Sequence, residues 1–100
     1  MKEAYLTEFL GTAYQLQRGE FFPEIHEKNL EELARNYPDI PKVLQDQLYR
    51  FTITLDTEAM KFAKRISRGE LSPEEAIQEL SVTFRYYSPE VIKFAIDWNS

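Results

Sequence analysis

The chain has 100 residues and a formal net charge of −5 at pH 7, with 43% hydrophobic and 29% charged residues. The hydrophobic share is too high for a disordered tail, and no apolar run approaches the roughly 18 residues that a membrane-spanning helix needs. The absence of cysteine excludes disulfides and thiolate chemistry and fits a cytoplasmic protein. We therefore expect a single acidic domain over residues 1–100 that does not bind a membrane.

The first helix is predicted over about residues 3–17, where apolar residues recur at steps of three and four. We expect Gly19 to end this helix in the left-handed conformation. Pro23 suits the first turn of a second helix, which we place over residues 23–36. The two predicted apolar stripes consist of Leu6, Phe9, Leu10, Ala13 and Leu16, and of Ile25, Leu30, Leu33, Ala34 and Tyr37.

The longest helix is predicted over residues 42–67, after Pro38 and Pro41 end the preceding helix. Its apolar stripe continues without a phase break through Val43, Leu44, Leu48, Phe51, Leu55, Ala59, Phe62 and Ile66. The alternative is a break near Thr52–Asp56, because β-branched residues there weaken helix propensity and Asp56 or Thr57 could start a new helix.

Two shorter helices complete the predicted structure. Ser72 and Glu75 have the spacing of a capping box, and Ser88-Pro89 resembles another helix start. The predicted inner face of the first of these helices consists of Ala76, Ile77, Leu80 and Phe84, and the second helix carries Val91, Ile92, Ala95, Ile96 and Trp98. Since no segment shows the alternation of a strand, we predict an all-α bundle of five helices, or six if the longest one is broken.

The chain also resembles itself at a spacing of 50 residues. Eleven of the 31 residues from Thr7 to Tyr37 are identical to those from Thr57 to Tyr87. Unrelated segments of ordinary composition would share roughly two. We therefore predict two pseudo-symmetric units of three helical segments each, over about residues 7–48 and 57–98, that share the long central helix.

The predicted turn at residues 18–24 recurs at 68–74. In each copy Gly ends a helix, Phe21 or Leu71 is expected to fill the corner, and Pro opens the next helix. Phe22 has no such role because its counterpart is the polar Ser72, so we expect it to be exposed and available to a partner.

Three further surfaces are candidates for binding. The acidic second helix carries Glu24, Glu27 and Glu31, which could face a basic partner. A basic ridge at helical spacing consists of Lys61, Lys64, Arg65 and Arg68, which could face an acidic protein or a phosphate. Solvated faces, ion pairs and helix-dipole effects explain both patterns without a partner, and we favour that explanation. Tyr86 and Trp98, unlike Tyr37 and Tyr87, are not an equivalent pair in the repeat, so the repeat gives them no role in the core. Aromatic residues of this kind are common in interfaces.

Nothing in the sequence favours catalysis. The single histidine, His26, has Pro23 rather than Glu three residues before it, so the Glu-x-x-His motif of di-iron bundles is absent. The three glycines do not cluster into a phosphate loop, and no serine lies in a nucleophile elbow. We expect no enzyme activity, no cofactor and no metal.

The tail Tyr86-Tyr87-Ser88-Pro89-Glu90, followed by Ile92, Ile96 and Trp98, resembles the end of the colicin nuclease immunity proteins, which are small, acidic and helical. The resemblance covers 13 residues, its Trp spacing differs, and the 50-residue repeat is not part of it. It implies an inhibitor-like binder and assigns no residue roles. The sequence thus predicts a non-enzymatic protein–protein interaction module, an adaptor, regulator or inhibitor, with a homodimer as one option. The alternative is a nucleic-acid-associated factor that uses the basic ridge, which the acidic net charge disfavours.

Overall fold

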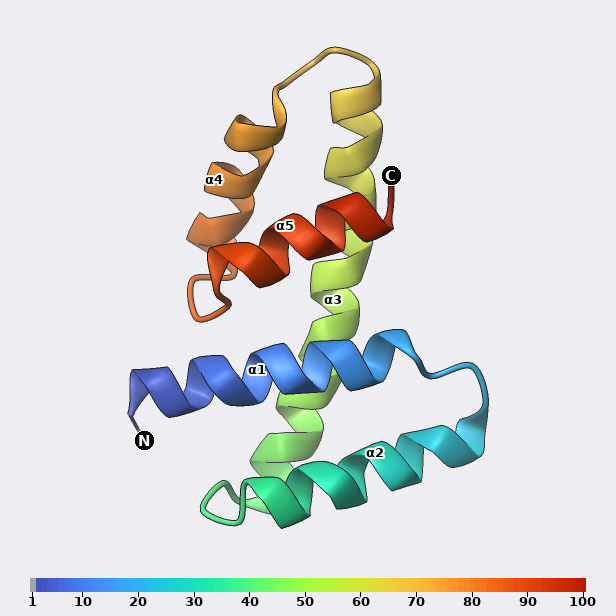
Figure 1. Ribbon diagram of the computed structural model, residues 1–100, viewed down its shortest axis with the longest axis vertical. Coiled ribbons are helices and arrows are strands. Elements are labelled where there is room, and N and C mark those ends of the chain that lie inside the picture. Colours follow the sequence, from blue (N-terminus) through green and yellow to red (C-terminus); the bar gives the residue numbers. More distant parts are fainter. Residues whose placement is uncertain (1) are drawn as a thin grey trace. The chain divides into compact units, whose positions relative to one another are not determined.

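The computed structural model describes residues 2–100, which contain five α-helices and no strand (Figure 1). The helices are α1 (Glu3–Arg18), α2 (Pro23–Asn36), α3 (Lys42–Ser67), α4 (Pro73–Thr83) and α5 (Pro89–Trp98). The all-α prediction is confirmed, and the predicted helix positions agree closely with the observed ones. Within residues 2–100, no helix combines the length and the apolar character that crossing a membrane requires.

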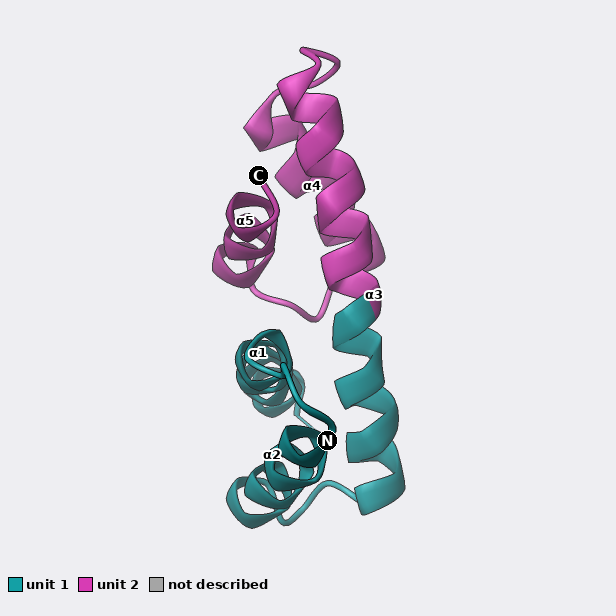
Figure 2. Cartoon of the chain, turned by 90° about the vertical axis from the view of Figure 1, so that its right-hand side faces the viewer, with its two compact units in different colours: residues 1–53 teal, residues 54–100 magenta. Residues whose placement is uncertain are grey.

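Helix α3 is continuous, so the alternative of a break near Thr52–Asp56 is wrong. Thr52 is fully buried, and its hydroxyl donates to the carbonyl of Tyr49 at 2.5 Å, which satisfies the polar group inside the helix. The chain forms two compact units, one up to Ile53 and the other from Thr54 onward, and their boundary falls within α3 (Figure 2). This boundary lies between the two predicted repeats.

In the first unit, α1 and α2 pack side by side in antiparallel directions (Figures 1 and 2). The ring of Tyr37, at the end of α2, lies 5.2 Å from the ring of Phe9 and 5.5 Å from that of Tyr5, between centroids. Its hydroxyl lies 2.9 Å from the Thr12 hydroxyl. The buried apolar side chains of this unit include Phe9, Leu10, Ala13, Tyr14, Leu33, Tyr37, Ile40 and Tyr49.

In the second unit, α4 packs against α5. The capping box is confirmed: the Ser72 hydroxyl accepts from the Glu75 N–H, and the Glu75 carboxylate accepts from the Ser72 N–H at 2.9 Å. The Ser88 hydroxyl caps α5 by accepting from the Val91 N–H at 3.2 Å. The buried apolar side chains here include Leu55, Ala59, Ala63, Leu71, Ala76, Leu80, Phe84, Tyr87, Ile92, Ala95 and Ile96.

The predicted apolar stripe of α3 is wrong in its first half. Val43 is 72% exposed and Phe51 is 39% exposed, whereas Gln45 and Tyr49 are buried. Gln45 Nε2 donates to the carbonyl oxygens of Tyr37 and Ile40, at 2.8 and 2.9 Å. These carbonyls belong to the connection between α2 and α3 and need a donor once they are buried. A polar side chain with such partners is therefore buried in preference to an apolar neighbour.

The two copies of the repeated turn differ in conformation. Gly69 has a φ of 74°, which is the left-handed conformation, but Gly19 has a φ of −87°. The expectation that Gly19 is left-handed is therefore wrong. Leu71 is 9% exposed as predicted, whereas Phe21 is 76% exposed, so the expectation that Phe21 fills the corner is also wrong. The pseudo-symmetry of the two units remains a prediction from the sequence.

Candidate functional site

A polar cluster lies inside the turn between α1 and α2. The Tyr49 hydroxyl of α3 donates to the carboxylate of Glu20 and accepts from Asn29 Nδ2 at 2.9 Å. The same Asn29 nitrogen donates to the carbonyl of Leu16 at 3.1 Å. His26 Nδ1 lies 3.1 Å from the second carboxylate oxygen of Glu20, and its ring packs edge-on against Tyr49. The cluster therefore joins α1, the turn, α2 and α3.

This cluster explains why Phe21 does not fill the corner. The Glu20 side chain is only 23% exposed because it turns inward toward Tyr49 and His26. Burial raises the pKa of Tyr49 well above its ordinary value, and the hydrogen bond to Glu20 raises it further. Tyr49 is therefore neutral at pH 7 and acts as a hydrogen-bond donor. The sequence offered one signal for the cluster, which is that Asn29 lies between Ile25 and Leu33 on one face of α2.

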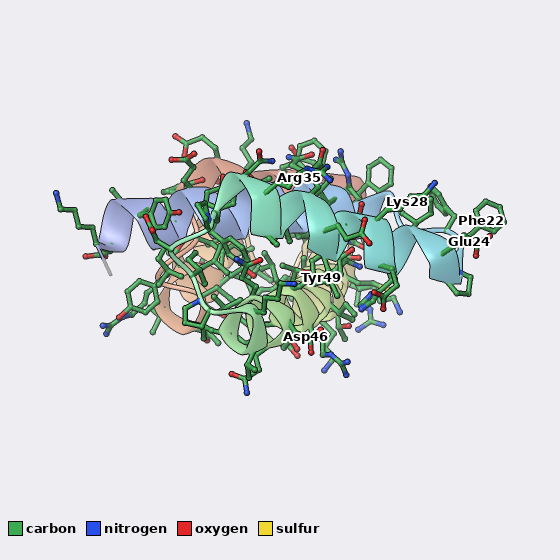
Figure 3. All side chains as sticks on the ribbon, turned by 90° about the horizontal axis from the view of Figure 1, so that it is seen from below. Phe22, Glu24, Lys28, Arg35, Asp46 and Tyr49 are labelled. Carbon is green, nitrogen blue, oxygen red and sulfur yellow. The ribbon has the colours of Figure 1, made fainter. Side chains whose placement is uncertain are left out.

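The outer side of the same turn carries two exposed phenylalanines. Phe21 is 76% exposed and Phe22 is 64% exposed, as expected for Phe22. Phe22 has extended backbone angles and precedes Pro23, the first residue of α2. Figure 3 shows Phe22 and Glu24 at the outer end of α2, with the Phe22 side chain directed away from the helices. We call these two residues the Phe21–Phe22 corner.

The acidic face of α2 borders a groove. Glu24, Glu27 and Glu31 are all exposed and share one face, since they are three and four residues apart. A groove of about 340 Å³ lies between α2 and the start of α3. Its lining includes Glu27, Leu30, Glu31, Ala34, Lys42 and Asp46. The structure therefore brings Glu27 and Glu31 together at one depression, whereas Glu24 lies nearer the Phe21–Phe22 corner.

The basic ridge on α3 is largely engaged by carboxylates of its own unit. Lys61 pairs with Glu58 at 3.1 Å. Arg65 lies 3.7 Å from both Glu70 and Glu79, and Arg68 lies 3.8 Å from Glu70. The fourth member, Lys64, is exposed and has no ion pair among residues 2–100. Such surface pairs contribute little to stability, but they reduce the positive charge that the ridge offers to a phosphate.

Tyr86 and Trp98 do not form a common patch. Tyr86 precedes α5 and Trp98 ends it, and a helix of ten residues is about 15 Å long. Tyr86 is 37% exposed, and Arg85 lies over its ring at 4.8 Å from the centroid. Trp98 is 54% exposed and stacks on Phe94, with ring centroids 6.3 Å apart.

No three histidine or carboxylate side chains of residues 2–100 converge as they would around a metal ion. A cavity of about 510 Å³ is lined by Lys2, Tyr5, Asp39 and Pro41, and its charged groups among these are the Lys2 ammonium and the Asp39 carboxylate. Comparison of the chain with protein-family models, with curated proteins and with solved structures found no match. The site must therefore be interpreted from its own geometry.

Proposed function

We propose that this protein is a small acidic, non-enzymatic module that binds another protein in the cytoplasm, as an adaptor, regulator or inhibitor. The Phe21–Phe22 corner is the contact that we propose for this binding. The observation that supports the proposal is the exposure of two adjacent phenylalanines, at 76% and 64%, on a turn whose inner side is hydrogen-bonded.

The physical argument rests on the balance between exposure and rigidity. Burying a phenylalanine side chain that is otherwise exposed stabilises a complex by roughly 1.5–3 kcal/mol before the costs of association. A turn held by Glu20, Asn29 and Tyr49 loses less conformational freedom on binding than a mobile loop would. Pre-organised aromatic anchors of this kind are characteristic of protein interfaces.

The test is affinity capture from the native host, with and without nuclease, followed by mass spectrometry. The bait is the unaltered chain or the double variant F21S/F22S, and V82S is the matched control because Val82 is 78% exposed in the other unit. We expect a stoichiometric protein that survives nuclease, is retained by V82S and is lost by F21S/F22S. Equal capture by all three baits would contradict the role of the corner.

The nucleic-acid alternative has less support, because three of the four basic ridge residues are paired with glutamates. Reversal of Lys61, Lys64 and Arg65 to Glu, combined with a salt titration, distinguishes it. Binding that falls steeply with salt and disappears in this variant would favour the ridge. A homodimer formed through the corner is the other alternative, and sedimentation of the F21S/F22S variant against the unaltered chain tests it.

A further inference from the structure

The groove between α2 and α3 combines apolar and acidic groups in one depression. Leu30 and Ala34 contribute apolar surface from α2, and both are partly exposed. Glu27 and Glu31 lie on the same helix one turn apart, and Asp46 faces them from α3. In Figure 3, Asp46 lies on the α3 side of α2, whereas Lys28 and Arg35 lie on its other side. The basic residues of α2 therefore do not neutralise the groove.

The carboxylates of the groove differ in whether they form an ion pair within the protein. Asp46 pairs with Arg50 at 3.2 Å. Glu27 and Glu31 have no cation within ion-pair distance among residues 2–100, unlike Glu58, Glu70 and Glu79 of the other unit. Lys42, at the start of α3, is the cation that lines the groove. The groove thus contains two carboxylates without an ion pair, and one ammonium, that of Lys42, which would compete with a bound cation for them.

We propose that this groove receives an arginine or lysine side chain of the partner protein. The aliphatic stem would lie on Leu30 and Ala34 while the cationic end reaches Glu27 and Glu31, as long basic side chains do when they combine an apolar stem with a charged head. The volume of about 340 Å³ is near the lower end of the range for ligand pockets, which suits a side chain or two rather than a large cofactor. This inference rests on the proposed function and specifies the chemistry of the partner.

The inference is tested with a defined probe, an alanine-based helical peptide that carries arginine and leucine one turn apart. The matched probe replaces each arginine with citrulline, which has nearly the same shape but no charge. Binding to the isotope-labelled full chain is followed by amide chemical shifts at low salt. We expect the arginine peptide to shift the amides around Glu27, Glu31 and Ala34, and the citrulline peptide to bind several-fold more weakly and so to shift them less at the same concentration.

Charge variants show whether these carboxylates are responsible. E27Q/E31Q should weaken binding of the arginine peptide by roughly fivefold, which corresponds to about 1 kcal/mol for partly exposed ion pairs. E74Q/E90Q is the control, because it removes the same charge from exposed glutamates of the other unit and should weaken binding by less than about twofold. K42Q should strengthen binding, because it removes the competing ammonium. Circular dichroism confirms that every variant is folded.

Equal weakening by the two glutamine pairs would overturn the inference, since it would reduce the effect to overall charge. Shifts centred away from the groove, or equal binding of the citrulline peptide, would overturn it as well. The proposed function fails separately: F21S/F22S should not change binding of the arginine peptide, whereas E27Q/E31Q should not abolish capture of the partner. If F21S/F22S no longer captures the partner and the arginine peptide does not bind the unaltered chain, the proposed function is supported and the role of the groove is refuted.

Discussion

Replacement of Tyr49 by phenylalanine is the most direct test of the cluster that holds the α1–α2 turn. The ring of Tyr49 is fully buried, so the variant preserves its packing and removes only the hydroxyl. That hydroxyl donates to the Glu20 carboxylate and accepts from Asn29. A hydrogen bond to a charged group contributes roughly 1.5–3 kcal/mol, so we expect Y49F to lower the free energy of unfolding by about 2 kcal/mol.

Urea unfolding followed by circular dichroism measures this loss. If the slope of the unfolding free energy against urea concentration is unchanged, only the stability has changed. The matched control is Y86F, since Tyr86 is partly exposed and its hydroxyl accepts from Arg85 at the surface. The control should change stability by less than about 0.5 kcal/mol. A loss from Y49F as small as that of Y86F would refute the view that the cluster anchors the turn.

Three further predictions concern the other features of the fold. G69A should lower the free energy of unfolding by about 1 kcal/mol because Gly69 has a φ of 74°, whereas G19A should be neutral or slightly stabilising because Gly19 has a φ of −87°. Thermal unfolding compares the two variants, and equal losses of stability would contradict the difference between the turns. S72A should cost about 1 kcal/mol by removing the cap of α4, and a urea titration in which the variant is as stable as the parent would count against the capping box. Burial raises the pKa of Tyr49 and of Tyr87 from the ordinary value of 10.0, so the folded state keeps protons that the unfolded state releases. The contribution of these two groups to stability should be complete below about pH 10 and should fall above it, and urea midpoints that stay level from pH 9 to pH 11 would contradict this.

Much of the helix pattern followed from local signals. Pro23, Pro73 and Pro89 each begin a helix, because a proline in the first turn loses no hydrogen bond. The Ser72 capping box was predicted from spacing alone and is present, because both of its bonds lie within four residues. Such signals depend only on neighbouring residues in the sequence, so the tertiary structure does not change them.

The candidate site could be predicted only in part. The exposure of Phe22 followed from its comparison with Ser72, and the shared face of Glu27 and Glu31 followed from helical spacing. The exposure of Phe21 and the inward turn of Glu20 did not, because both depend on Tyr49, which is 29 residues away from Glu20 along the chain. Periodicity assigns burial by hydrophobicity, and it cannot anticipate a carboxylate that finds a buried donor.

By itself the sequence determined the helix class and the positions of the helices, since capping and periodicity are local properties. It left the continuity of α3 near Thr52–Asp56 open, and the structure decided it. Tertiary structure decided which face of α3 is buried and which turn residues are exposed. It did so because burial depends on whether each polar group finds a partner: Gln45 meets the carbonyls of Tyr37 and Ile40, and Tyr49 meets Glu20 and Asn29. Once those partners are in place, Val43 and Phe21 remain exposed to solvent.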